Sequence, residues 1–257
     1  MEIILIIFFG LLGACIGSFL NVVIDRLPAG KSLAYPPSSC DACQHRLSWP
    51  DMFPVFSYIF LRGRCRYCGA KIPIRVMLVE LGTGILTAFL YVHFGLVWML
   101  PVAIAYSAVL IAIAIIDLDH QLILNKIVYP VSLVALVLNF FVPSLFNLHN
   151  FLFGLLGMAV GFLILFLPAL ISRKGMGWGD VKMAGMLGLM VGFPNVIVAV
   201  FGGIIIGGVV AIILLATKKK SRKDGIPFGP YLSLAAIITL LWGSEIIHWY
   251  LRLFKLE

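Results

Sequence analysis

Five stretches of the 257-residue chain contain no Asp, Glu, Lys or Arg, and this absence of charge limits what the chain can fold into. A helix needs about 20 apolar residues to cross a bilayer, so we expect the three longest stretches to cross it twice each. The whole chain is 62% hydrophobic and 12% charged, against roughly 45–50% and about 25% in soluble domains. The sequence therefore predicts an all-α polytopic membrane protein. The charge-free stretches are residues 3–24, 81–116, 127–172, 183–217 and 225–244.

The chain can reverse direction near the middle of each long stretch, where polar or turn-forming residues occur. These points are His93-Phe94-Gly95 with Pro101, residues 143–150 and residues 192–195. They give about eight transmembrane helices. The first stretch resembles a signal peptide in position, but it is longer than the usual apolar region and carries Glu2 where basic residues belong. We expect it to be retained as the first helix, residues 1–24.

The basic residues predict the orientation, because short loops rich in Lys and Arg remain on the cytoplasmic side. With eight spans and an outside amino terminus, the loops 25–76, 117–126, 172–182 and 217–230 face inward and hold 17 of the 19 Lys and Arg residues. The net charge of +8 could also indicate a nucleic-acid partner. However, the basic run 218–223 directly follows an apolar helix, which is typical of an anchor to anionic headgroups. We therefore predict a bilayer partner and no nucleic acid.

Residues 25–76 are the one long polar segment, and we interpret them as a small cytoplasmic domain. It contains two Cys-x-x-Cys pairs, Cys40 with Cys43 and Cys65 with Cys68. This spacing is close to that of four-cysteine zinc sites, and a segment without a large core benefits from such a staple. We predict a structural zinc ion. Disulfides or a redox pair are the alternatives, but the predicted compartment is reducing. Cys15 lies in the first helix and is expected to pack there.

Two acidic positions lie at the predicted cytoplasmic ends of helices. The helix ending at Ile116 leads directly into Asp117 and Asp119, and Asp180 precedes another apolar helix. Acidic groups at a membrane are costly and are functional candidates. If Asp117 and Asp180 approach each other in a low-dielectric site, one of them stays protonated. An ionised and a neutral carboxyl group form the pair that aspartic proteases use to activate water.

Each aspartate also has a simpler interpretation. Either could be solvated at the headgroups, and Asp180 could cap the helix that follows it. Gly177 and Gly179 favour a functional role for Asp180, because glycine lets the backbone bend and another segment approach closely. Lys182 follows in the same segment.

Several segments resemble the type IV prepilin peptidases. The sequence GMGWGDVKMAGMLG is similar to the GxGD motif of that family, and IDLDHQLILN is similar to its first aspartate motif. Similar matches occur in GSFLNVVIDRLP, CDACQHRLSW, FSYIFLRGRCRYCGAKI, VELGTG and IPFGPYLSLA. The similarity extends over about residues 10–240. Where the family usually has Leu-Pro-Asp or Leu-Pro-Asn, this chain has Ile123-Leu124-Asn125.

The resemblance implies a bacterial inner-membrane enzyme that removes the basic leader of type IV prepilins and pseudopilins at the cytoplasmic face. It implies that Asp117 and Asp180 are the catalytic pair, with Asp119 a weaker candidate, and that residues 77–257 form the peptidase domain. Two-domain members also N-methylate the new terminus with S-adenosylmethionine, an activity to which the four-cysteine domain belongs. The sequence reveals no methyl-donor site, since Gly82-x-Gly84 is too weak a motif. Glu80 could serve methyl transfer, but we expect it to pair with Arg75.

Other functions remain open on the sequence alone. One is a GxGD protease that cuts inside the helices of other substrates, although such proteases are not known for a cysteine-rich insertion. Another is a proton-coupled transporter in which Asp117, Asp180, His93 and His120 relay protons. A transporter would favour broken helices that recur in two similar halves, and the two halves of this chain are not alike. A purely structural assembly protein is a further alternative.

Overall fold

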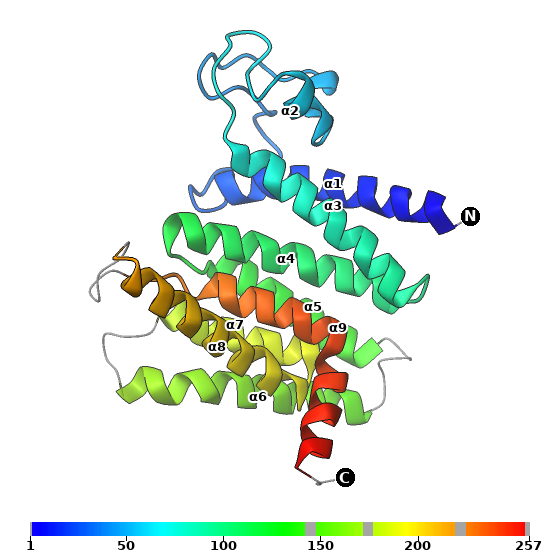
Figure 1. The fold of residues 1–257 in the computed structure, drawn as a ribbon, viewed down its shortest axis with the longest axis vertical. Coiled ribbons are helices and arrows are strands. Elements are labelled where there is room, and N and C mark those ends of the chain that lie inside the picture. Colours follow the sequence, from blue (N-terminus) through cyan, green and yellow to red (C-terminus); the bar gives the residue numbers. More distant parts are fainter. Residues whose placement is uncertain (1, 142–147, 172–176, 219–224, 255–257) are drawn as a thin grey trace. The chain divides into compact units, whose positions relative to one another are not determined.

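The computed structural model describes residues 2–141, 148–171, 177–218 and 225–254. Within these residues the regular structure is helical, and the only strand-like features are two isolated β-bridges. The all-α prediction is therefore confirmed. The chain divides into two compact units, Met1–Ala112 and Ile113–Glu257 (Figure 1).

The first unit is built on two long helices with the cysteine-rich segment between them. Their backbones touch, because a Cβ atom on Gly13 would lie 2.6 Å from the Thr83 carbonyl oxygen and one on Gly17 would lie 2.7 Å from the Glu80 Cα atom. Small residues allow helices to approach this closely in membrane proteins. The elements of this unit are α1 (Glu2–Arg26), the 3₁₀ helix η1 (Trp49–Met52), α2 (Phe56–Phe60), α3 (Ile74–Phe94) and the first part of α4 (Met99–His120).

The second unit surrounds one short helix, α7. The side chains of Val181 and of every residue from Met183 to Met190 are buried, and a helix that is apolar on all sides belongs in a core. Gly157 and Gly188 bring α6 and α7 into backbone contact, with no room for a Cβ atom on Gly188. Besides the end of α4, this unit contains α5 (Asn125–Phe141), α6 (Leu148–Ile171), α7 (Trp178–Val191), α8 (Asn195–Ala216) and α9 (Gly229–Leu253).

Among the described residues, six helices are long and apolar enough to cross a membrane. Two further helices of the second unit are shorter, since α5 has 17 residues and α7 has 14. At 1.5 Å per residue α7 is about 21 Å long, less than the roughly 30 Å of hydrocarbon. A multi-pass membrane protein is therefore supported, whereas the count of eight spans is not confirmed. These six helices are Glu2–Arg26, Ile74–Phe94, Met99–His120, Phe151–Ile171, Asn195–Ala216 and Gly229–Leu253.

Two of the predicted reversal points coincide with helix ends. Gly95 ends α3 with a positive φ of 70°, and Gly192 ends α7 with a φ of 71°. Both angles favour glycine. Most of the third point, residues 143–150, lies outside the described residues, as do most of the basic run 218–223 and the first two residues of the GMGWGD segment.

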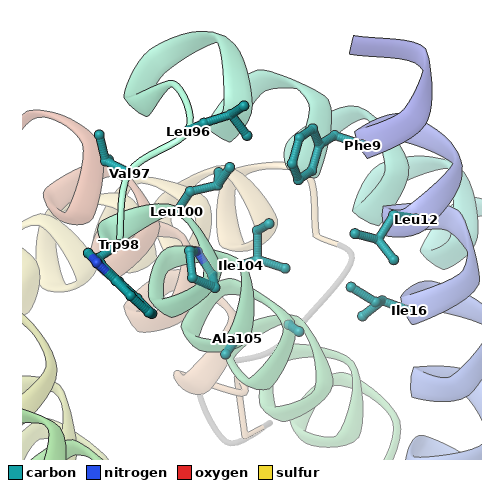
Figure 2. Close-up of a pocket in the computed structure, with 11 residues that line it drawn as sticks. Phe9, Leu12, Ile16, Leu96, Val97, Trp98, Leu100, Ile104 and Ala105 are labelled. Carbon is teal, nitrogen blue, oxygen red and sulfur yellow. The ribbon is translucent and has the colours of Figure 1, made fainter. Parts of the chain in front are cut away.

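The first unit also contains an apolar hollow of about 640 Å³. Figure 2 shows α1 side chains on one wall and side chains of α4 and the residues just before it on the other. Its described walls include no ionisable side chain. Without a group that could move a proton or hold a charge, this hollow is not a catalytic candidate. The lining residues labelled in Figure 2 are Phe9, Leu12, Ile16, Leu96, Val97, Trp98, Leu100, Ile104 and Ala105.

Candidate functional site

Asp117 lies in the last turn of α4, which ends at His120. The sequence placed the end of this helix at Ile116, and the structure extends it by four residues. A carboxylate near the carboxyl end of its own helix is electrostatically unfavourable. The amino end of α9 compensates, because the Gly229 backbone amide donates a hydrogen bond to Asp117 Oδ2 at 2.8 Å. The Asp117 residue is only 4% exposed.

Asp180 occupies the opposite kind of position, in the first turn of α7. Gly177 is the amino-terminal cap, with extended backbone angles, and its carbonyl accepts a hydrogen bond from the Asp180 amide at 3.1 Å. The Asp180 carboxylate also interacts with the Gly177 backbone. Asp180 is thus not the cap of α7, but its side chain interacts with the cap residue. This interaction holds the Asp180 carboxylate at the positive end of the α7 dipole.

Asp117 lies at the end of α4 and Asp180 at the start of α7, within electrostatic range of each other. Each of the two carboxylates lies beside the amino terminus of a helix, Asp117 beside that of α9 and Asp180 in the first turn of α7. Asp119 is exposed instead. Two residues of an α-helix correspond to a rotation of about 200°, so Asp119 lies on the face of α4 away from Asp117. The structure thus separates the two candidates that the sequence placed side by side.

Two glycines make room for this arrangement. A Cβ atom on Gly229 would lie 2.8 Å from Asp117 Oδ2, and one on Gly179 would lie 2.8 Å from the Cβ atom of Ile123. Gly179 therefore lets the connection between α4 and α5 pack against the start of α7. This contact involves the segment in which the chain departs from the family pattern, and it gives Ile123 a structural role.

Lys182 connects α7 to α5. Its Nζ atom donates a hydrogen bond to Asn125 Oδ1 at 3.1 Å and lies 5.6 Å from the centroid of the Tyr129 ring. Asn125 is the first residue of α5. Lys182 therefore supports the position of α7 relative to the α4–α5 connection.

Gly229 is the site residue that the sequence did not single out. It occurs in the segment IPFGPYLSLA, which was matched by resemblance without a role for any residue. The sequence feature that could have indicated it is a Gly-Pro pair at the start of a helix. Pro230 fits there because the first amides of a helix have no hydrogen-bond partner within the helix. Gln121 adds a second link to the same segment, since its side-chain amide donates to the Gly225 carbonyl at 3.2 Å.

The four cysteines of the polar segment form a second candidate site. Their Sγ atoms all lie within 4.8 Å of one another, and the Cys40 and Cys68 sulfurs are 3.8 Å apart. Four thiolates at about 2.3 Å from a zinc ion in tetrahedral geometry are roughly 3.8 Å from each other. The donor set and spacing therefore fit zinc. All four cysteines are free of disulfide bonds. The predicted clustering is confirmed.

The two cysteine pairs have the same backbone fold, a repeat that was not predicted from the sequence. The amides of Cys40 and Cys65 donate to the carbonyls of residues five positions later, and their carbonyls accept from the amides four positions later. The residue after the second cysteine has a positive φ in each case, 57° at Gln44 and 73° at Gly69. The signal in the sequence was the common order of Cys, Cys, a basic residue and an aliphatic residue.

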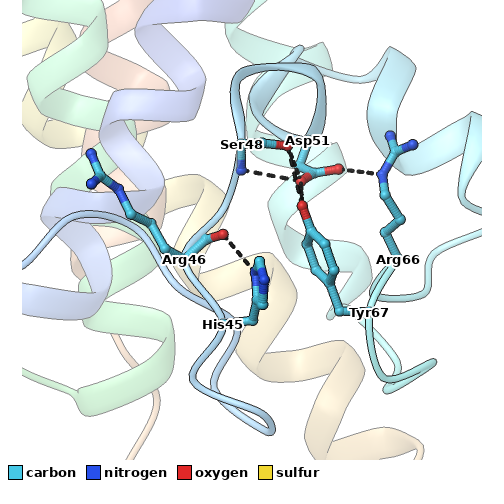
Figure 3. Close-up of polar contacts among 6 residues, drawn as sticks. All are labelled: His45, Arg46, Ser48, Asp51, Arg66 and Tyr67. Carbon is cyan, nitrogen blue, oxygen red and sulfur yellow. Dashed lines mark hydrogen bonds and ion pairs between the residues drawn. The ribbon is translucent and has the colours of Figure 1, made fainter.

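A network centred on Asp51 joins the two cysteine knuckles (Figure 3). Its carboxylate accepts hydrogen bonds from the Ser48 hydroxyl at 2.6 Å, from Arg66 Nε at 2.6 Å and from the Tyr67 hydroxyl at 3.0 Å. Burial alone would raise the pKa of Asp51, but these hydrogen bonds, with that of the Ser48 amide, lower it from 3.8 to about 2. The His45 ring stacks on Tyr67 with the centroids 3.7 Å apart.

Glu80 is buried in α3, and its carboxylate accepts a hydrogen bond from the Val55 amide at 2.7 Å. The sequence favoured pairing of Glu80 with Arg75. In the structure Arg75 forms an ion pair with Asp25 at the end of α1. Glu80 thus holds the start of α2 against α3, and Arg75 ties the ends of α1 and α3 together.

Comparisons with known proteins match two regions of this chain to family models. Residues 11–94 match the bacterial peptidase A24 N-terminal domain, and residues 104–212 match the type IV leader peptidase family. The prepilin leader peptidase/N-methyltransferase of Stutzerimonas stutzeri is 34% identical over 95% of this chain and 93% of its own length. The proteins of that name from Pseudomonas aeruginosa and Bacillus subtilis are 34% and 31% identical, each over 94% of this chain. No solved structure matches the chain. The chain therefore belongs to the type IV leader peptidase family.

Proposed function

We propose that this protein cleaves the leader peptides of type IV prepilins and pseudopilins with Asp117 and Asp180 as its catalytic pair. The observation that supports this most directly is that the two carboxylates, from α4 and α7, lie within electrostatic range of each other. The family membership and the names of the relatives supply the substrate class.

Cleavage would proceed without a covalent enzyme intermediate. Two carboxyl groups that lie side by side in a low-dielectric site share one proton. The ionised member takes a proton from a water molecule as the water oxygen attacks the scissile carbonyl, while the neutral member donates a hydrogen bond to that carbonyl oxygen. Collapse of the tetrahedral species breaks the C–N bond, and the leaving nitrogen receives a proton from the pair. The Gly229 amide keeps the Asp117 carboxylate in place throughout.

The site would face the cytoplasm, where the basic leader of a prepilin lies. The distribution of Lys and Arg, with 17 of 19 in the predicted inward loops, supports this topology. A cysteine introduced by Ser38→Cys should stay unmodified when whole cells are treated with a membrane-impermeant thiol reagent. Ready labelling would show that the domain lies outside the cell and that the predicted topology is inverted.

The four-cysteine domain would hold structural zinc through Cys40, Cys43, Cys65 and Cys68. The ion would supply a rigid crosslink between the two knuckles rather than a reacting centre, since four thiolates leave no open position. We further propose that the enzyme N-methylates the new terminus with S-adenosylmethionine, as the names of the relatives imply.

The decisive experiment incubates purified protein with a prepilin, with and without S-adenosylmethionine, and measures intact masses. We expect loss of the leader in both cases and a further gain of one methyl group only with the donor. Unchanged prepilin mass with the folded enzyme would contradict the peptidase proposal. Cleavage of the transmembrane part of the prepilin instead of its leader would favour the intramembrane-protease alternative. In the transporter alternative, neither product forms.

A further inference from the structure

The segment containing η1 and α2 exposes a group of large apolar side chains, although none of the candidate membrane spans includes it. Their exposed fractions range from 47% to 82%. Four of them, Trp49, Phe53, Phe56 and Phe60, line a hollow of about 430 Å³ whose only charged lining residue, among those described, is Arg66. We call this group the aromatic surface, and it consists of Trp49, Met52, Phe53, Phe56, Ile59 and Phe60.

The hydrogen bond between Val55 and Glu80 determines where the aromatic surface lies along α3. Val55 caps the start of α2, and Glu80 lies six residues after Ile74, where α3 begins. Six residues of helix correspond to about 9 Å. The long charge-free stretch of α3 begins at the next residue, Leu81. The aromatic surface is therefore held beside α3, at the level where the charged end of α3 meets its apolar span.

The charge of the surrounding segment is mainly positive. Residues 26–75 contain eight Lys and Arg but only two acidic residues, Asp41 and Asp51. Asp51 is already paired with Arg66. Four further basic side chains of this segment are exposed, namely Arg46, Arg62, Arg64 and Lys71.

We propose that the aromatic surface inserts into the headgroup region of an anionic phospholipid bilayer, at the face of the membrane where α1 ends and α3 begins. Trp is favoured at this depth because its ring is amphipathic, and Phe on an exposed apolar face also inserts at the boundary between headgroups and acyl chains. The exposed basic side chains of the same segment are attracted by anionic headgroups. A basic prepilin leader, the other ligand at hand under the proposed function, would instead be repelled. The four-cysteine domain would then be held at the bilayer surface by the aromatic surface as well as by its two chain connections.

The test uses the full-length protein in vesicles of phosphatidylglycerol and phosphatidylethanolamine that contain a phospholipid with a photoreactive acyl chain. After illumination, peptide mapping locates the lipid adducts. We expect adducts within residues 49–60 at a level comparable to that at Ile3 and Ile4 of α1, which are 72% and 71% exposed. Tyr35 is an internal control, because it is 76% exposed in the same domain but outside the aromatic surface. It should not be labelled.

Two changes should reduce the adducts several-fold without altering those on α1. One is Phe56→Ser with Phe60→Ser, for which Tyr35→Ser is the matched control. The other is replacement of phosphatidylglycerol by phosphatidylcholine. Absence of adducts within residues 49–60 of the natural protein, with α1 labelled normally, would overturn the proposal even if the double variant failed to fold. A photoreactive amino acid at position 60 that crosslinked to a second copy, to a prepilin or to the rest of the chain, rather than to lipid, would overturn it too.

Discussion

Asp117 Oδ2 lies 2.8 Å from the backbone nitrogen of Gly229, across 112 residues of sequence. This hydrogen bond joins the end of α4 to the start of α9. It directs the positive end of one helix dipole at a carboxylate that its own helix would disfavour. The orientation of Asp117 is therefore determined by a helix from the far end of the chain.

Adding a methyl group at position 229 should disturb this contact. Because the new Cβ atom would lie 2.8 Å from Asp117 Oδ2, Gly229→Ala should displace the carboxylate and lower prepilin cleavage by about 10²-fold. The control is Gly208→Ala in α8, where nothing lies within 4 Å of the added atom. Both variants should insert into the membrane normally. Equal activity of the two variants would contradict a positioning role for Gly229.

Replacing either proposed catalytic aspartate by Asn removes proton exchange while nearly preserving shape. Asp117→Asn and Asp180→Asn should each lower cleavage by about 10³-fold or more. Because the pair acts as a unit, the double variant should be no worse than either single one. Asp119→Asn is the matched control and should be mild, since Asp119 is exposed. Normal cleavage by the Asp180→Asn protein would show that the wrong carboxylates have been paired.

The contact between Gly179 and Ile123 can be tested by compensation. Gly179→Ala would place its Cβ atom 2.8 Å from the Ile123 Cβ atom, an overpacking that should cost about 1–3 kcal/mol of stability. Ile123→Gly removes the opposing atom. In a double-mutant cycle measured by thermal unfolding in detergent, the two changes should show a coupling of about 1 kcal/mol. Simple additivity would mean that the two residues do not touch.

Zinc should be present at one ion per chain by elemental analysis of the purified protein. Cys65→Ser combined with Cys68→Ser removes two of the four ligands and should release the metal. Because the metal-binding free energy contributes to folding, the same variant should unfold residues 25–76 and make them sensitive to protease. Cys15→Ser is the control and should keep the zinc. Full zinc occupancy in the double variant would exclude this site.

Asp51 should stabilise the domain in a pH-dependent way. Its pKa is lowered from 3.8 to about 2 in the folded state, so its contribution is fully present above the unfolded pKa and is lost as the pH falls through the folded pKa. At pH 7, Asp51→Asn should cost about 1–3 kcal/mol. The difference in melting temperature between the natural protein and this variant should shrink between about pH 4 and pH 2. A difference independent of pH would contradict an ionic role.

Only part of the candidate site could be predicted from sequence. The aspartates could be found because each interrupts or adjoins an apolar stretch, and the cysteines could be found by their spacing. In contrast, Gly229 and the contact of Gly179 with Ile123 depend on helices that meet only after packing. The pairing of Glu80 shows the same limit, since Arg75 was near in sequence whereas the amide of Val55 approaches only because α2 folds back along α3.

The sequence by itself determined that the chain is a helical membrane protein, where its polar domain lies, and which acidic and thiol groups could react or bind metal. These properties follow from local hydrophobicity, charge and residue spacing, which act over one helix or one turn. Tertiary structure alone decided that α7 is a short buried core helix. It also decided that Asp117 is buried while Asp119 lies on the exposed face of α4, and that the Gly229 amide holds the Asp117 carboxylate. These relationships arise from close packing between segments distant in sequence, where a single Cβ atom determines whether two backbones can meet.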